Sequence, residues 1–195
     1  GKWFSYIVGA FDGYDSATGN KNPDAPLRLT GHVAFNPIGE AEKDWFYSQE
    51  RLGKKGNYLS IGAGIDKQDK ATLTTIAATD TTPEQKIEND SDNWVVDVQS
   101  GFVIDSVMLT LNGAYYDWDN STFKGNTAFA ETGVMFRKTQ LTGKYSIQDP
   151  DAGKDTEDYT VGINYFMKGH NARGGIEYRW GDSPDMVLAG IQFLL

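Results

Sequence analysis

The chain has 195 residues, a net charge of −9 and no cysteine. This length suits one large domain, the missing cysteines exclude disulfides and cysteine-based metal sites, and the acidic balance argues against a nucleic-acid partner. Mean hydropathy is −0.49, and no apolar run approaches the roughly 18 residues that a membrane helix needs.

Ten segments alternate with the two-residue period of β-strands and follow one another along the chain. They are predicted at 3–11, 27–36, 58–66, 94–102, 107–116, 127–136, 139–147, 158–167, 171–180 and 186–195. The whole chain, 1–195, is therefore predicted to form a single all-β domain.

The connections between these segments alternate in length. Short ones are predicted at 103–106, 137–138 and 168–170, with 37–57 as a long exception on the same side. Long polar ones are predicted at 12–26, 67–93, 117–126, 148–157 and 181–185. The longest contains Asp80, Glu84, Glu88, Asp90 and Asp92, and we expect it to be a solvated extracellular loop. Long loops at one end and tight turns at the other are typical of outer-membrane barrels.

The charged side chains of the segments fall on one face. In the ninth segment the polar side holds Asn171, Arg173, Gly175, Glu177 and Arg179, and the other side holds Ala172, Gly174, Ile176, Tyr178 and Trp180. The opposite face elsewhere is uncharged, as at Leu111, Ile163 and Ile191, although 3–11 has no polar side. A sheet with one apolar and one polar face forms either a soluble shell around an apolar core or a membrane barrel around water.

Aromatic residues favour the membrane arrangement, because on the apolar face they gather near the strand ends, where a girdle would meet the bilayer interfaces. They are Phe35, Phe102, Tyr115, Phe136, Tyr145, Tyr159, Tyr165, Tyr178 and Trp180. Tilted strands of about nine or ten residues match the hydrocarbon thickness, and a sheet in lipid must close. The sequence therefore predicts a transmembrane antiparallel β-barrel with about ten strands.

Two stretches carry a family resemblance. Residues 28–39 read as a strand followed by an Asn36-Pro37 turn, and 159–195 read as strand, tight turn, strand, Arg179-Trp180-Gly181-Asp182 and terminal strand. Both stretches resemble the phosphate-selective porin O/P family of Gram-negative outer membranes. The resemblance implies an anion or phosphate preference, and an extended periplasmic connection after 39 with a short helix over 40–51. The last residue is Leu195, with Phe193 two positions earlier, where the assembly signal of outer-membrane proteins has a terminal aromatic residue.

The strand number departs from this family, whose porins have sixteen strands. The chain is therefore either the C-terminal part of a larger barrel or a smaller barrel that closes with about ten strands. In a ten-stranded barrel, side chains such as Phe129, Met135, Phe166 and Leu188 would narrow the lumen.

The polar face supplies the predicted pore lining. These residues are Arg28, His32, Asp97, Glu131, Lys144, Arg173, Glu177 and Arg179. The expected function is passive diffusion of small hydrophilic solutes or ions through a water-filled lumen, with selectivity set by diameter and lining charge. Because cations and carboxylates are interleaved, the residues themselves do not specify an anion preference. The expected partners are the outer-membrane bilayer with its lipopolysaccharide, the solutes or anions, and, as one option, further copies in a homotrimer.

Catalysis, cofactors and metals are not expected. We expect His32 to be an isolated imidazole on the polar face, without the serine that an outer-membrane phospholipase would need, and His170 to lie in a solvated turn. The stretch from Asp149 to Asp155 resembles a calcium loop, but its glycine is misplaced and Thr160 stands where the twelfth-position glutamate belongs.

Two alternatives remain open from the sequence. One is a non-conducting outer-membrane barrel whose extracellular loops bind a ligand, which single-channel conductance would distinguish from a porin. The other is a soluble β-protein that binds carbohydrate through exposed aromatics, which would stay monodisperse without detergent.

Overall fold

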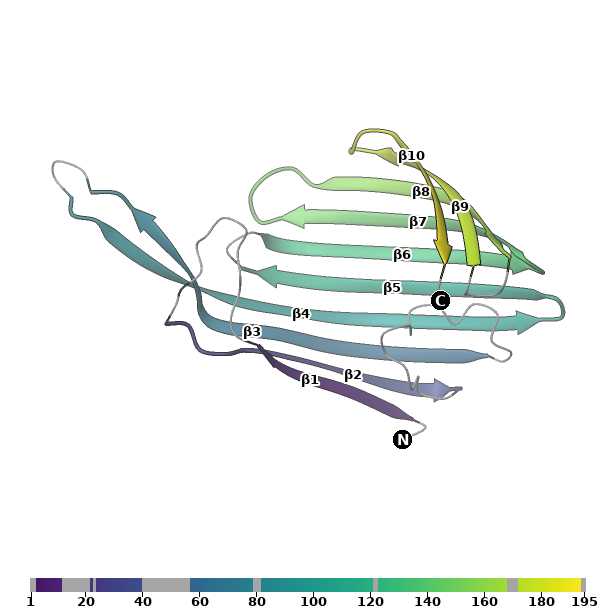
Figure 1. The fold of residues 1–195 in the computed structure, drawn as a ribbon, viewed down its shortest axis with the longest axis horizontal. Helices are drawn as coiled ribbons and strands as arrows, with labels where there is room; N and C mark the ends of the chain where they lie inside the picture. Colours follow the sequence, from purple (N-terminus) through teal and green to yellow (C-terminus); the bar gives the residue numbers. More distant parts are fainter. Residues whose placement is uncertain are drawn as a thin grey trace.

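The computed structural model describes residues 3–11, 22, 24–39, 57–78, 82–120, 123–167 and 172–193. These residues form one antiparallel sheet of ten strands, in which each strand pairs with its neighbours in the chain (Figure 1). The strands are β1 Phe4–Phe11, β2 Arg28–Ile38, β3 Tyr58–Ile76, β4 Gln85–Ile104, β5 Val107–Asp119, β6 Lys124–Phe136, β7 Thr139–Pro150, β8 Thr156–Phe166, β9 Ala172–Gly181 and β10 Met186–Phe193. The all-β prediction and its ten strands are confirmed. The predicted helix over 40–51 and His170 lie outside the described residues.

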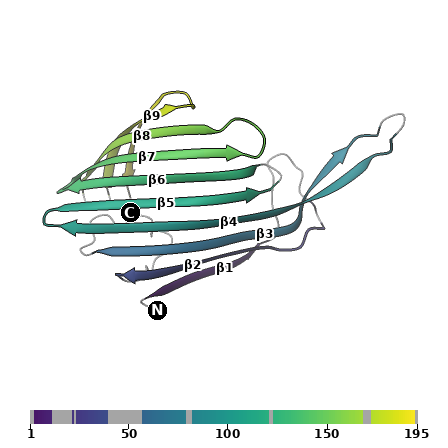
Figure 2. The same cartoon turned by 180° about the vertical axis from the view of Figure 1, so that it is seen from behind.

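The sheet is strongly curled but open. β9 and β10 turn away from the plane of the middle strands and cross in front of them in Figure 1, and the reverse view shows β9 behind the sheet (Figure 2). Among the described strands, β1 and β10 each pair on one side only. The strands are also staggered relative to one another. The row of directly opposed residues that starts at Leu188, near the beginning of β10, ends at Tyr58, the first residue of β3. Such a stagger is the geometry that lets a sheet curl around a central axis.

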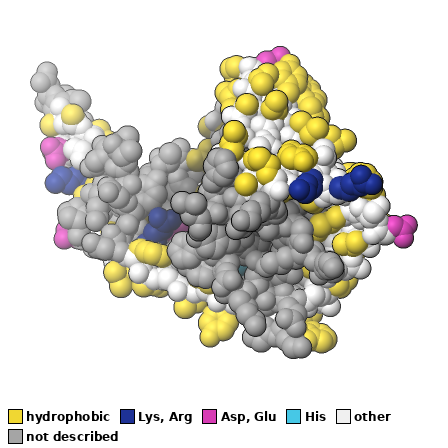
Figure 3. Space-filling view, turned by 45° about the vertical axis from the view of Figure 1, so that its right-hand side comes forward, with side chains coloured by type: hydrophobic (Ala, Val, Ile, Leu, Met, Phe, Trp, Pro, Cys, Tyr) yellow, Lys and Arg dark blue, Asp and Glu magenta, His cyan; other side chains and the backbone are white. Residues whose placement is uncertain are grey.

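The pairing register keeps the two predicted faces separate across all ten strands. On the apolar face uncharged positions oppose one another, as in Tyr178 of β9, which faces Val161 of β8 and Val187 of β10. This apolar face is uncovered: the exposed fractions are 53% for Leu111, 46% for Ile163 and 69% for Ile191. Figure 3 shows hydrophobic side chains spread over the described surface, with few charged side chains among them.

Aromatic rings on this apolar face contact one another across neighbouring strands. The ring centroids of Trp94 and Tyr115 are 5.4 Å apart, those of Tyr145 and Tyr159 5.2 Å, and those of Tyr159 and Trp180 5.8 Å. Cross-strand aromatic pairs of this kind stabilise a sheet by up to about 1 kcal/mol each. The rings form a band on the uncovered face rather than a packed interior.

The described residues have almost no apolar core. The accessible surface of the chain is 13022 Å², against roughly 9,200 Å² for a compact soluble protein of the same mass. The buried apolar side chains among the described residues are Ala34, Tyr58, Ala71, Met108 and Phe166. No described helix is long and apolar enough to cross a membrane.

The predicted loop 67–93 is wrong over most of its length. β3 continues to Ile76 and β4 begins at Gln85, so the two strands extend as a hairpin beyond the rest of the sheet (Figure 1). Cross-strand polar pairs hold this hairpin, including Lys67–Asp92 and Lys70–Glu88, each at 2.9 Å. The sequence hides these strands because both of their faces are polar, which leaves no apolar alternation to detect.

Four other strands are also longer than predicted. β5 to β8 run two or three residues into the predicted connections 117–126 and 148–157. The short turns are where they were expected: Asp105 and Arg137 adopt positive φ angles of 55° in the β4–β5 and β6–β7 turns. Tight turns therefore join β4 to β5 and β6 to β7 at one end of the sheet, as predicted.

Candidate functional site

The polar face of the sheet is hollowed into a cavity of about 570 Å³, which we call the polar trough. Its lining is His32, Tyr58, Val95, Asp97, Val98, Gln99, Thr110, Asn112, Gly113, Ala114, Tyr116, Phe129, Glu131, Gln140, Thr142, Lys144, Thr160, Asn164, Arg173 and Glu177. Six of the eight predicted lining residues therefore share one cavity. Arg28 and Arg179 lie on the same face by register, next to Phe11 of β1 and Met186 of β10, but outside this cavity.

His32 is paired rather than isolated, which corrects the expectation for this residue. Its Nε2 atom lies 2.7 Å from Oδ2 of Asp97, although the two residues stand on β2 and β4 with β3 between them. Gly62 of β3 makes this contact feasible, because an added Cβ there would lie 2.6 Å from the imidazole Nε2. The partner of this histidine is a carboxylate, so the pair has no nucleophile of the serine type.

Arg28 is also held by a carboxylate. Its Nε donates to Oδ1 of Asp66 at 2.6 Å, and a second guanidinium nitrogen bonds to Oδ2 of the same side chain. A two-point arginine–carboxylate contact fixes both groups in one plane. The cation predicted at this position is therefore neutralised by Asp66, outside the polar trough.

A row of polar residues in direct register runs along the trough face, and its members from Gln99 to Thr160 line the trough. From β3 to β9 it consists of Ser60, Gln99, Asn112, Glu131, Lys144, Thr160 and Arg179. Within it Glu131 and Lys144 oppose each other on β6 and β7. The Lys144 ammonium also lies 4.9 Å from the centroid of the Phe129 ring, a distance at which a cation is attracted to an aromatic face.

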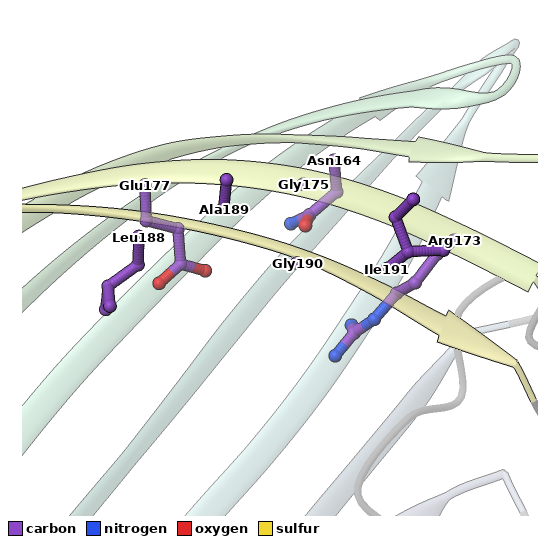
Figure 4. A pocket seen from close by; sticks show the side chains of 8 residues that line it. All are labelled: Asn164, Arg173, Gly175, Glu177, Leu188, Ala189, Gly190 and Ile191. Atoms are coloured by element: carbon purple, nitrogen blue, oxygen red, sulfur yellow. The ribbon is translucent and has the colours of Figure 1, made fainter.

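Arg173 and Glu177 bring further opposite charges to the β9 side. Both side chains project from the same side of β9, with Leu188 of β10 beside Glu177 (Figure 4). Charges of both signs are therefore interleaved across the trough, as the sequence predicted. A phosphate-selective site needs a cluster of cations without carboxylates among them. The described lining of the trough contains no such cluster.

Sequence reasoning missed aromatic residues of the trough face, among them Tyr58, Tyr116 and Trp118. Tyr116 and Trp118 of β5 stack with centroids 5.2 Å apart and an interplanar angle of 14°. The predicted strand 107–116 ends before Trp118, which therefore falls in a predicted connection. Its signal was available in the alternation, since Tyr116 and Trp118 are in phase with Thr110 and Asn112 on the polar side.

Outside the trough, the β9–β10 connection is tied to the start of β8. Lys154 Nζ lies 2.9 Å from Oδ1 of Asp182, and the backbone N–H of Glu157 donates to Oδ2 at 3.1 Å. The hydrogen bond from Lys154 and then the one from Glu157 lower the pKa of Asp182 below its usual value. These contacts fix the connection at the long-loop end of the sheet.

The described residues hold no group of three or more His, Asp or Glu side chains arranged to bind a metal ion. No family model, curated protein or solved structure matches the chain.

Proposed function

We propose that the protein is a porin of a Gram-negative outer membrane that lets small hydrophilic solutes or ions diffuse through a lumen lined by the polar trough. The uncovered apolar face is the observation that carries this proposal. In water each Å² of apolar surface costs about 25 cal/mol, whereas lipid removes that cost. A sheet that turns Leu111, Ile163 and Ile191 outward and its charges inward suits a bilayer with an aqueous interior.

A soluble carbohydrate-binding protein fits this arrangement poorly. It would have to bury the apolar face, and contiguous exposed apolar patches on soluble monomers rarely exceed a few hundred Å². Here the uncovered apolar positions extend over every strand from β2 to β10, from Val33 to Ile191. Their continuity supports a lipid environment for the whole sheet.

Spanning the bilayer requires the two free edges to find partners, because each unpaired backbone group in hydrocarbon costs several kcal/mol. Each of the nine strand pairings is antiparallel, so β1 and β10 point in opposite directions. Their apolar sides also face the same way in the sheet. The proposal therefore includes closure of a ten-stranded barrel by antiparallel pairing of β1 with β10.

Disulfide trapping tests this closure without interference, because the natural chain has no cysteine. Ala10→Cys on the apolar side of β1 is combined in turn with Val187→Cys, Ala189→Cys or Ile191→Cys on the same side of β10. One of the three pairs should form an intrachain disulfide in high yield, since a closed barrel has one register.

The control places the β1 cysteine at Phe11, which faces the trough, and should give no disulfide with the same three partners. Non-reducing electrophoresis and peptide mapping distinguish the outcomes. Disulfides between chains would assign the edges to another copy. A complete absence of disulfides would favour the longer, sixteen-stranded barrel that the porin O/P resemblance implies.

The resemblance to the phosphate-selective porin O/P family belongs to the same proposal, but the charge arrangement supports weak ion selectivity. Arg28 is neutralised by Asp66, and Lys144 faces Glu131. Replacing Lys144 and Arg173 by glutamate should make the channel more permeable to cations relative to anions. In planar bilayers under a salt gradient, we expect single channels of this variant to show a reversal potential shifted toward the cation value.

A matched variant carries the same charge change away from the trough, at Lys86 on the β3–β4 hairpin and Lys138 in the β6–β7 turn. Its reversal potential should stay close to that of the natural protein. If both variants behave alike, Lys144 and Arg173 do not line the conducting path. If the natural protein inserts but never conducts, the barrel is closed to solutes and the porin proposal fails.

A further inference from the structure

Three of the aromatic side chains on the trough face, Trp118, Tyr116 and Phe129, lie near one another on β5 and β6. Trp118 and Tyr116 follow each other along β5, and Phe129 of β6 lies one position further along, opposite Ala114. On the register, Trp118 faces Gly125, which has no side chain. The rings therefore form a short line along the strand direction, with a small neighbour on one side of Trp118 (Gly125) and of Phe129 (Ala114).

Contacts fix these rings in place. Trp118 donates from its indole Nε1 to Oγ1 of Thr127 at 2.8 Å and stacks against Tyr116 at 14° between planes. Phe129 is held under the Lys144 ammonium at 4.9 Å. Rings that are already immobilised lose little side-chain entropy when a ligand packs on them. The aromatic line is therefore organised before any ligand arrives.

Hydrogen-bonding groups border this line. Asn112 of β5 faces Glu131 of β6, which faces Lys144 of β7. Glu131 is two residues beyond Phe129 on β6, on the same face. Together Asn112, Glu131 and Lys144 offer an amide with donors and an acceptor, a carboxylate acceptor and an ammonium donor. The carboxylate of Glu131 disfavours an anion here, and the ammonium of Lys144 disfavours a cation, so an uncharged polar ligand suits the pair.

We propose that the polar trough contains a binding subsite for neutral sugars. The apolar C–H face of a pyranose ring would pack on Trp118, Tyr116 and Phe129, and its hydroxyl groups would bond to Asn112, Glu131 and Lys144. Tyr116 and Phe129 line the cavity, and Trp118 stacks on Tyr116 at its border. The cavity volume of about 570 Å³ falls within the roughly 300–1,000 Å³ usual for small-ligand sites. This inference rests on the proposed porin function, because it requires the trough to be open to water, and it names the class of solute.

Tryptophan fluorescence of the detergent-solubilised full chain tests the inference without relying on conductance. Trp94 and Trp180 lie on the apolar face by register, Trp3 contacts Phe35, and Trp45 lies outside the described residues. A ligand in the trough should perturb Trp118, and the Trp118→Phe variant assigns the signal to it. Titration with maltotriose, a neutral chain of three pyranose rings, should give a saturable change in emission. That change should disappear in Trp118→Phe.

Phe129→Ala should weaken the maltotriose affinity roughly tenfold through the lost ring contact. Tyr145→Ala, which removes an aromatic ring from the opposite face, is the matched control and should bind as the natural protein does. Inorganic phosphate at the same concentrations should leave the emission unchanged.

The outcomes separate the subsite from the porin function. A natural protein that conducts but shows no saturable maltotriose response overturns the sugar subsite and leaves the porin proposal standing. A response that survives Trp118→Phe and Phe129→Ala but is lost in Tyr145→Ala would move sugar binding to the outer face, and also overturns it. A response to phosphate in place of maltotriose would overturn the proposed solute class.

Discussion

Replacing Leu111 by arginine is expected to destabilise the protein in phospholipid vesicles by about 2–4 kcal/mol, the cost of a cationic side chain on the lipid face near the bilayer midplane. Leu111 is the middle position of the apolar face of β5 and is 53% exposed. The same substitution at the adjacent Asn112 should cost far less, because that residue faces the polar trough opposite Glu131. The two variants have the same added charge and differ only in the face that receives it.

The free energy of unfolding, measured by denaturant titration of tryptophan fluorescence in vesicles, checks this pair. If the apolar face were in contact with water, the two substitutions would differ little in their effect on stability. An exposed leucine replaced by arginine in water changes the free energy of unfolding by about 0.5 kcal/mol or less. An arginine at position 111 that is tolerated as well as one at 112 would therefore remove lipid from the apolar face and with it the porin proposal.

The second large effect is expected from Gly181→Ala at the end of β9. Gly181 has a φ of +143°, and an added Cβ would overlap the carbonyl oxygen of Glu157 and approach Cα of Asp158 to 2.9 Å. Both obstacles are backbone atoms of β8, which cannot move aside as a flexible side chain would. A side chain forced into such a backbone conformation costs about 1–3 kcal/mol even without the overlap, so we expect a loss at or above that range.

Gly190→Ala in β10 is the matched control, because no heavy atom lies within 4 Å of the Cβ that it would add. It should leave stability unchanged or raise it by a few tenths of a kcal/mol. Denaturant midpoints of both variants, measured under the same conditions, make the comparison. The contacts from the β9–β10 connection to Glu157 and Asp158, including Asp182 N to Glu157 O at 2.8 Å, would be the first lost. Equal midpoints would show that the close approach at Gly181 does not constrain the fold.

Alternation in the sequence was sufficient for the strands that have one apolar face. Around Leu111 in β5 and Ile163 in β8 the period of two is a local property of the backbone, so it identifies both the strand and its outward side without any knowledge of its partners. The β3–β4 hairpin shows where this fails. Its outer part is polar on both faces, and the pairs Lys67–Asp92 and Lys70–Glu88 that hold it exist only once the two strands are in register.

The candidate site shows the same division. The polar positions of the trough could be named from the sequence, but the contact between His32 and Asp97 across Gly62 could not. Nor could the line formed by Trp118, Tyr116 and Phe129, since Phe129 joins it from another strand. Contacts of this kind depend on which residues the ladder places side by side, and one residue of slip would turn every side chain to the other face.

The amino-acid sequence by itself determined the all-β class, the ten strands and the sorting of charge to one side, because each depends on neighbours one or two residues apart. Only the tertiary structure decided that the apolar side is uncovered, that six predicted lining residues meet in one cavity and that Arg28 is neutralised by Asp66. These features depend on strand register and on the curl of the sheet. Both arise from hydrogen bonds between residues far apart in the chain.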